Sequence, residues 1–264
     1  MTNFFPIVEI KISTFEEFII KFSDSIKHIK ENIDNSELSQ EGKNILIQNK
    51  YDKVLYRGQE NLEFELMPKI GRKGFYVKKE TEKTEIEVFE EFKRRNFSHL
   101  DRFNSINDWD LLAIAQHHGL PTRLLDWTEN PLVALWFAFA TETNNVKNRV
   151  VWAFLPLNDE IVTEKTKGGP YNQTETKVFK PRHTNNRIIA QQGWFTVHKF
   201  SKNSTFVPFN KNNKYNKRLM KFTIPNELRN EILNKLDKLG VNFYSIFPDT
   251  EGLCKYLQWK TFQK

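Results

Sequence analysis

The sequence has almost no cysteine and no long apolar run. Cys254 is the only cysteine among 264 residues, which excludes an intramolecular disulfide and any metal site built from several cysteines. The most apolar stretch, from Pro131 to Ala140, is about half as long as the ~20 residues that a helix needs to cross a bilayer. The first residues also lack the pattern of a secretory signal. We therefore expect a cytoplasmic protein with no membrane partner.

Acidic residues are fewer than basic ones, with 33 Asp and Glu against 40 Lys and Arg, which gives a net charge of +7. A positive charge favours anionic partners such as a nucleotide, a nucleic acid or a phosphorylated surface. Many of the lysines are scattered among Asn and Ile, however, and such dispersion is more typical of a solvated surface than of a binding patch. Aromatic residues are abundant, including 23 Phe, and this excludes disorder of the whole chain.

Helical and strand patterns alternate without a break in composition. Apolar periodicity and capping residues predict helices over 14–33, 81–97, 109–118, 131–140, 227–239 and 251–262. Short apolar runs predict strands over 53–56, 149–155, 187–198, 219–224 and 243–247. Strands that alternate with helices and then follow one another late in the chain indicate a single α+β domain. We expect residues 1–50 to form a helical extension packed on a domain of residues 51–264.

The most site-like segment runs from Gln116 to Ala140. It carries several chemically capable side chains on a turn punctuated by Gly119 and Pro121, just before an apolar helix. Functional groups are often presented by such loops on a rigid scaffold. The candidate residues are His117, His118, Arg123, Asp126, Trp127 and Thr128.

This segment and three others resemble a known family. Leu55-Tyr-Arg-Gly-Gln59, the run from Leu111 to Ala138, Arg187 to Phe195 and Phe247 to Leu253 are similar to the FRG domain, a bacterial and phage family named for a Phe-Arg-Gly motif. Tyr56 stands where the motif has Phe. The resemblance covers most of the chain after residue 50.

A second resemblance implies a chemistry. An Arg-Gly late in an early strand, followed by a Thr segment that leads into a helix with Ala134 and Phe137, resembles the layout of ADP-ribosyltransferases. That family implies a split, mostly antiparallel central sheet flanked by helices, with NAD as the substrate. The resemblance would make Arg57, beside Gly58, the residue that holds a phosphate, and Thr128 the hydroxyl that braces the ribose. A guanidinium suits this role because its planar fork binds phosphate oxygens in pairs.

The late glutamate of that family is missing. The corresponding segment offers Gln191 and Gln192, and an amide does not stabilise a developing positive charge as a carboxylate does. The acid or base would then come from His117, His118, Asp126 or Glu251, or the protein would bind NAD without transferring it.

Each candidate also has a structural explanation. Arg57 would bond carbonyl groups or Asp126, Arg123 and Asp126 would form a local salt bridge, and one of the two histidines would cap its helix. Trp127 and Trp194 would pack in the core rather than stack on a ligand. No His-x-His or His-x-x-x-His pair occurs, so we expect no metal.

These observations favour an ADP-ribosyltransferase-like, NAD-handling domain that acts as a toxin-like effector in bacterial defence or phage–host conflict. Arg57, Gly58, Arg123, Asp126, Trp127 and Thr128 would bind NAD, and His117, His118, Gln191 and Gln192 would be the catalytic candidates. The acceptor would be a protein or a nucleic acid, reached by the basic segment 199–218. The alternatives are a noncatalytic sensor that binds a nucleotide or a partner and, third, a nuclease.

Overall fold

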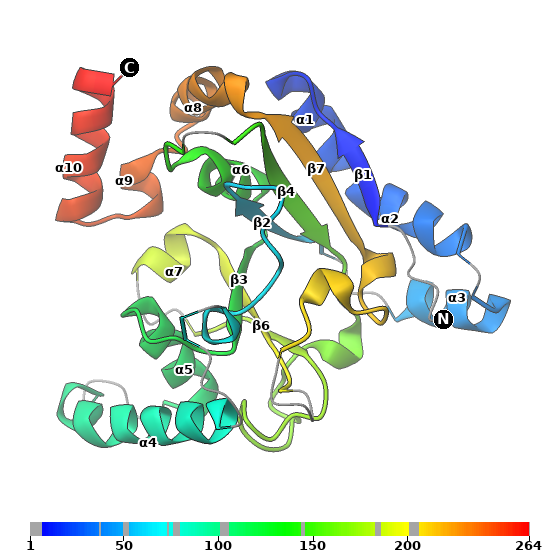
Figure 1. The fold of residues 1–264 in the computed structure, drawn as a ribbon, viewed down its shortest axis with the longest axis vertical. Helices are drawn as coiled ribbons and strands as arrows, with labels where there is room; N and C mark the ends of the chain where they lie inside the picture. Colours follow the sequence, from blue (N-terminus) through cyan, green and yellow to red (C-terminus); the bar gives the residue numbers. More distant parts are fainter. Residues whose placement is uncertain are drawn as a thin grey trace.

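The computed structural model describes residues 7–36, 38–49, 53–72, 74–75, 80–100, 106–143, 146–182, 186–200 and 206–263. Seven strands form one sheet in the order β1-β7-β4-β2-β3-β6-β5 (Figure 1). Their bounds are β1 Val8–Lys11, β2 Leu55–Gln59, β3 Leu124–Thr128, β4 Asn148–Phe154, β5 Lys177–Phe179, β6 Gly193–Val197 and β7 Leu219–Pro225. Every neighbouring pair is antiparallel except β1 with β7. The expected α+β domain with a mostly antiparallel sheet and flanking helices is confirmed.

Ten α-helices lie in the described residues. They are α1 Phe15–Ser23, α2 Ser25–Asp34, α3 Gln40–Gln48, α4 Thr81–Leu100, α5 Asp108–His117, α6 Pro131–Phe139, α7 Asn186–Ala190, α8 Arg229–Lys238, α9 Phe243–Ile246 and α10 Thr250–Gln258. None of them is both long and apolar enough to span a bilayer. The first 50 residues hold α1 to α3 but also β1, which pairs with β7 at the edge of the sheet.

The core is divided between the two faces of the sheet because side chains alternate along each strand. In β4, Val151 and Ala153 pack with α1, α2, α6 and α8, whereas Val150, Trp152 and Phe154 join the apolar cluster of the opposite face. A third cluster fixes α4 and α5 against β3, β5 and β6. In Figure 1, α9 and α10 stand at the edge of the molecule beyond α7.

Helix α6 is the central helix, and the sequence predicts it correctly. The Asn130 side chain accepts hydrogen bonds from the backbone N–H groups of Leu132 and Val133, and Pro131 occupies the first helical position. The helix is buried on nearly every side, as expected for a helix that is apolar all round. It packs most closely on β2, and so fixes the strand that carries Arg57.

Three predicted elements are wrong. The helix over 14–33 is broken at Asp24 into α1 and α2, where the hydroxyls of Ser23 and Ser25 bond back to carbonyl groups of the preceding turn. The strand predicted over 243–247 is helix α9, because the Asn242 side chain caps the N–H groups of Tyr244 and Ser245. The strand predicted over 187–198 divides into α7 and β6, with Gln191 and Gln192 in the turn between them.

Candidate functional site

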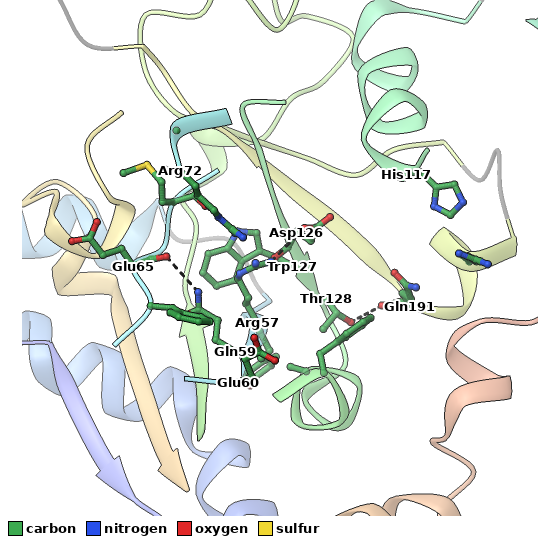
Figure 2. A pocket seen from close by; sticks show the side chains of 18 of the residues that line it. Arg57, Gln59, Glu60, Glu65, Arg72, His117, Asp126, Trp127, Thr128 and Gln191 are labelled. Atoms are coloured by element: carbon green, nitrogen blue, oxygen red, sulfur yellow. Dashed lines mark hydrogen bonds and ion pairs between the residues drawn. The ribbon is translucent and has the colours of Figure 1, made fainter. Parts of the chain in front are cut away.

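A cavity of about 770 Å³ is lined by residues of β2 and β3, the two neighbouring strands with the fewest paired residues. Strands β2 and β3 are joined by a single residue pair, Tyr56 with Thr128, and they diverge beyond it. The walls are formed by β2 and the segment after it, by β3, by α6, by the end of α5, and by the turns around Gln191 and Phe247 (Figure 2). The seven strands nevertheless remain in one sheet, and the ADP-ribosyltransferase-like layout that the resemblance implies stays a prediction.

The structure brings most of the predicted site residues to this cavity. Arg57, Gly58, His117, Asp126, Trp127, Thr128 and Gln191 line it. Arg57 and Thr128 lie on neighbouring strands, so the proximity that the sequence could not establish is present. Arg123, His118 and Gln192 do not line it. The predicted residues thus fall into those that line the cavity and those that do not, and the roles of all of them stay predictions.

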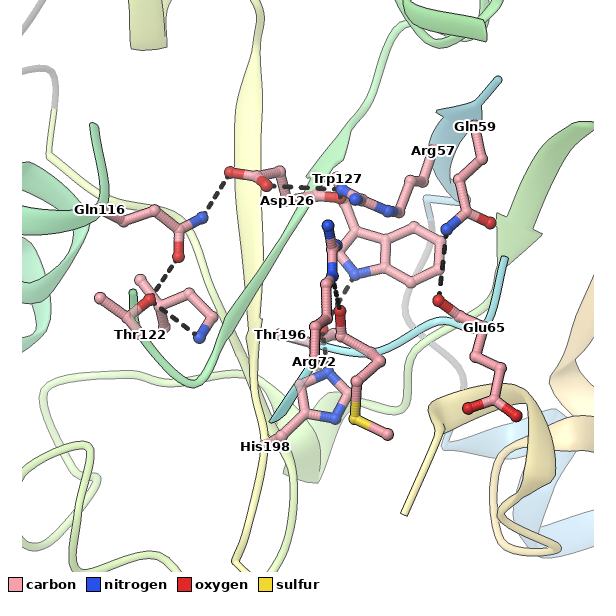
Figure 3. Close-up of polar contacts among 12 residues, drawn as sticks. Arg57, Gln59, Glu65, Arg72, Gln116, Thr122, Asp126, Trp127, Thr196 and His198 are labelled. Carbon is pink, nitrogen blue, oxygen red and sulfur yellow. Dashed lines mark hydrogen bonds and ion pairs between the residues drawn. The ribbon is translucent and has the colours of Figure 1, made fainter. Parts of the chain in front are cut away.

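Arg57 bridges the diverging strands. Its Nη1 donates to the backbone carbonyl of Asp126 at 2.7 Å and lies 3.4 Å from the Asp126 carboxylate (Figure 3). Its Nη2 has no hydrogen bond to a described residue, and its buried Nε also lacks a partner. Burial lowers the pKa of Arg57, with a smaller effect from the charge of Arg72. The expected carbonyl and Asp126 contacts therefore exist, and they use only one of the three guanidinium nitrogens.

Asp126 is held by a second side chain. Gln116 Nε2 donates to Asp126 Oδ1 at 2.7 Å, and the Thr122 hydroxyl donates to the Gln116 carbonyl oxygen (Figure 3). These bonds orient the Gln116 amide, and hence the carboxylate that anchors Arg57. Asp126 lies on strand β3 rather than on a turn. Gln116 is the first residue of the site-like segment, but the sequence does not predict it as a site residue. Its position beside His117 is the one feature of the sequence that points to it.

Thr128 and Gln191 fasten β3 to the turn before β6. The Thr128 hydroxyl donates to the Gln191 carbonyl at 2.7 Å and accepts from the Asn130 N–H at 3.0 Å. The Gln191 amide donates to the Ile246 carbonyl at 3.3 Å, so it lies between α9 and the cavity. Gln192 is exposed and has a positive φ of 47°, which is typical of a turn. The Thr128 proton is thus already used within the protein.

Gly58 lacks a side chain for a different reason from the one that the sequence indicates. A Cβ atom at this position would lie 1.9 Å from the carbonyl oxygen of Ala134 and 2.5 Å from the amide nitrogen of Ala138. The space beside Gly58 is therefore filled by the backbone of α6, and a ligand does not approach it on that side. The glycine allows the helix to cross β2 at close range.

The two histidines separate as helix geometry requires. His117 lines the cavity, while His118 is exposed at the C-cap of α5. Partial burial lowers the pKa of His117, helped by the neighbouring His118 and Arg187. The imidazole in the cavity is therefore neutral at pH 7 and is able to accept a proton.

Arg123 belongs to a buried ion pair. Its Nη2 lies 2.8 Å from a Glu85 oxygen and its backbone N–H donates to the other oxygen at 2.9 Å. Both side chains are about 2% exposed, and the guanidinium lies 4.5 Å from the ring centre of Tyr171. The predicted salt bridge between Arg123 and Asp126 is wrong, because Glu85 on α4 takes the arginine and Arg57 takes the aspartate.

Trp127 is mainly a core residue whose indole ring forms the cavity floor. It is 3% exposed and packs against Phe154 and Phe209. Its Nε1 donates to the Thr196 hydroxyl at 3.0 Å, and that hydroxyl lies 2.9 Å from His198 Nε2 (Figure 3). The Thr196 proton is therefore available to a neutral His198, and the three side chains form a buried polar chain behind the cavity.

The buried His198 of this polar chain predicts that the free energy of unfolding falls at acidic pH. Burial and the charges of Arg57 and Arg123 lower the pKa of His198 to about 3, against about 6.5 when unfolded. Between these values the unfolded state binds the extra proton, so stability falls as the pH is lowered. At pH 4.5 this amounts to about 2–3 kcal/mol, at ~1.4 kcal/mol per pH unit.

The measurement is urea denaturation of the wild type and His198→Gln at pH 7 and pH 4.5. We expect the variant to be less stable than the wild type at pH 7. The difference should shrink by about 2–3 kcal/mol at pH 4.5, because only the wild type loses the histidine contribution. His118→Gln, at the exposed neighbour of His117, is the control and should keep the wild-type profile. Parallel profiles for the wild type and His198→Gln would contradict this assignment.

Several residues of the cavity were missed by sequence reasoning. Arg72, Glu60, Glu63 and Glu65 line it from the segment after β2, where no periodic pattern marks them. Glu65 pairs with Lys211, and Glu60 accepts from the Thr143 hydroxyl at 3.3 Å.

The last two resembling segments meet at the rim of the cavity. Arg187 lies 2.5 Å from an Asp249 oxygen and over the Phe247 ring, and both Arg187 and Phe247 line the cavity. Asp249 also caps α10 by accepting from the Gly252 N–H at 2.9 Å. Glu251, one of the residues expected to supply the acid or base, lies outside the cavity and pairs with Lys255.

The basic segment 199–218 is less accessible than its composition indicates, and its residues 201–205 lie outside the described residues. Arg218 is buried in an ion pair with Glu160 at 2.7 Å, and Lys217 is also buried. Lys211 and Lys214 pair with Glu65 and Glu175. Within the described part of the chain, no group of three or more His, Cys, Asp or Glu side chains is arranged to hold a metal ion.

Comparison with known proteins gives one match. Neither the curated proteins nor the solved structures include a match to this chain. Residues 52–147 match the family model of the FRG domain, and this region contains β2, the cavity wall with Arg72, the Gln116–Asp126 pair and α6. The resemblance to the FRG domain is thereby confirmed for residues 52–147, whereas the similar segments 187–195 and 247–253 lie outside the matched region.

Proposed function

We propose that this chain is an ADP-ribosyltransferase-like domain that binds NAD in the β2–β3 cavity and breaks the bond between nicotinamide and ribose. The observation that carries the proposal is Arg57, whose Nη1 is anchored on Asp126 while its Nη2 makes no bond to a described residue. Arginine fixed on one side and open on the other is well suited to phosphate. A cavity of about 770 Å³ is within the usual range for small-molecule sites, roughly 300–1,000 Å³.

The cavity also offers a group for the proton. In the proposed reaction an acceptor nucleophile forms a bond to the ribose carbon, the glycosidic bond breaks, and nicotinamide leaves with the bonding electrons. The acceptor loses a proton, which neutral His117 in the lining of the cavity would take. With water as the acceptor, the same step is NAD hydrolysis. The bracing role of Thr128 is then indirect, because its proton holds the Gln191 carbonyl.

A second function is favoured by the position of Gln191. Its side-chain amide is directed to the Ile246 carbonyl, and no carboxylate stands in its place, which supports a sensor that binds a nucleotide without turnover. The protein or nucleic-acid acceptor, the cytoplasmic location and the toxin-like role in bacterial defence follow from the resemblances and belong to the first proposal.

The test of the site is replacement of Arg57 by alanine. Loss of charged hydrogen bonds to phosphate is worth about 1.5–3 kcal/mol, so NAD binding should weaken roughly 10- to 150-fold and nicotinamide release should fall with it. The measurements are calorimetric titration with NAD and nicotinamide release from the purified protein. Arg95→Ala, at an arginine 74% exposed on α4, is the matched control and should behave as the wild type.

The outcomes separate the candidates. Nicotinamide release that Arg57→Ala abolishes supports the transferase or hydrolase, and binding without release supports the sensor. Wild-type binding in Arg57→Ala would contradict both. Release assays repeated with a chelator, and a parallel nucleic-acid cleavage assay, test the nuclease alternative.

A further inference from the structure

A second arginine reaches the same cavity from outside the sheet. Arg72 follows the short 3₁₀ turn Lys69–Gly71, and its side chain lines the cavity together with Arg57. Figures 2 and 3 show the two side chains directed toward one another above Trp127. They come from different elements, since Arg57 lies on β2 and Arg72 on the segment that follows it.

Arg72 is held in a way that leaves its charged end open. Its Nε donates to the Met67 carbonyl at 3.0 Å, and this bond orients the guanidinium group. Neither of its terminal nitrogens bonds to a described residue, and none of the described carboxylates forms an ion pair with it. Together with Arg57 Nη2, three terminal nitrogens in this cavity have no partner within the described chain.

Positive charge exceeds negative charge in the immediate contacts of Arg57 and Arg72. Four carboxylates line the cavity: those of Glu60, Glu63, Glu65 and Asp126. Asp126 contacts Arg57, and Glu65 pairs with Lys211. Glu60 accepts from the Thr143 hydroxyl, and within the described residues neither Glu60 nor Glu63 forms an ion pair with Arg57 or Arg72. The charge of Arg72 also lowers the pKa of Arg57, so the two cations repel one another. Among the described residues, Asp126 is the one carboxylate in contact with these two adjacent guanidinium groups, and a doubly charged anion bound to both would reduce their mutual repulsion.

We propose that Arg72 and Arg57 form a two-arginine clamp for a diphosphate, with Arg57 on one phosphate and Arg72 on the next. This inference rests on the proposed function, and it narrows the ligand to one with two linked phosphates, such as a dinucleotide or a nucleoside diphosphate. A nucleoside monophosphate would contact a single arginine. Arg72 is therefore a residue that determines specificity.

The experiment compares ligands rather than activities. Full-length wild type, Arg72→Ala, Arg72→Gln and Arg95→Ala are titrated calorimetrically with ADP-ribose, ADP and AMP. In both Arg72 variants the Kd for ADP-ribose and ADP should rise roughly 10-fold or more, while the Kd for AMP should change less than 3-fold. Because Arg72 is exposed, both variants should unfold at the wild-type temperature. Arg95→Ala should bind all three ligands as the wild type does.

Each result has a distinct meaning. Equal weakening for AMP and ADP-ribose, or no weakening, overturns the clamp while leaving the cavity as the NAD site. Failure of the wild type to bind NAD, ADP-ribose and ADP overturns the proposed function itself. Raising the salt concentration should weaken ADP-ribose binding more steeply in the wild type than in Arg72→Ala, because one fewer cation contacts the ligand.

Discussion

Replacement of Gly58 by alanine should destabilise the whole domain by more than about 3 kcal/mol. The added Cβ would lie 1.9 Å from the Ala134 carbonyl oxygen and 2.5 Å from the Ala138 nitrogen, two atoms that form one helical hydrogen bond. Both belong to backbone, so no side chain can rotate away. Overpacking of ordinary side chains already costs about 1–3 kcal/mol, and here a buried helix must move away from its strand.

The measurement is thermal and urea denaturation of Gly58→Ala beside the wild type. A loss of this size corresponds to a melting temperature lower by roughly 6–12 °C for a chain of this length. Gly169→Ala is the control, because a Cβ there would meet its nearest neighbour at 3.6 Å and stability should change by less than about 0.5 kcal/mol. A Gly58→Ala protein as stable as the wild type but deficient in NAD binding would restore the earlier interpretation of Gly58 as a ligand contact.

This glycine shows which parts of the structure a sequence predicts. The period and caps of α6 and the alternation of β4 are local signals, so both elements are found with nearly the right bounds. The crossing of α6 over Gly58 joins residues about 75 positions apart in the chain, and no local pattern reveals it. The sequence therefore assigns both Arg57 and Gly58 to ligand binding, whereas in the structure Gly58 allows α6 to pack on β2.

Elements that depend on competing local signals were predicted less well. The aromatic run 243–247 has the composition of a strand, but the Asn242 cap begins a helix instead. The strand predicted over 187–198 is too long because α7 is only one turn long and is separated from β6 by a turn of two residues.

Within the site, the sequence identified the residues of the motif but not their partners. Arg57 and Asp126 were both named, and they meet. Arg72 lies in a segment without helical or strand periodicity, and only the folded chain places it beside Arg57. Arg123 was placed in the site because of its position three residues before Asp126, yet its partner Glu85 precedes it by 38 residues.

Arg123 therefore provides the second large expected effect, and one that separates structure from binding. Replacement by methionine should lower the free energy of unfolding by about 3–5 kcal/mol, because it leaves the carboxylate of Glu85 buried without its partner. Lys83→Ala is the control, since Lys83 and Glu87 form an exposed pair at 3.7 Å, and pairs of this kind contribute about 0–1 kcal/mol.

The double variant Arg123→Met with Glu85→Gln tests the cause. The glutamine removes the buried charge but keeps an oxygen for the backbone N–H of residue 123, which the Glu85 carboxylate accepts at 2.9 Å. It should recover part of the loss, with a coupling energy of about 0.5–3 kcal/mol in a double-mutant cycle. Strictly additive losses would show that the charge of Glu85 is not the reason for the instability.

NAD binding should distinguish Arg57 from Arg123 in the opposite sense to stability. Below its melting temperature, folded Arg123→Met should bind NAD with the wild-type Kd, because Arg123 does not reach the cavity. Arg57→Ala should weaken binding while removing a contact whose loss changes stability by only about 1 kcal/mol. If Arg123→Met instead remained as stable as the wild type and lost NAD, the phosphate would have to lie on the α4 side of β3. Arg57, Asp126 and Gln116 would then have only a structural role in the wall of the cavity.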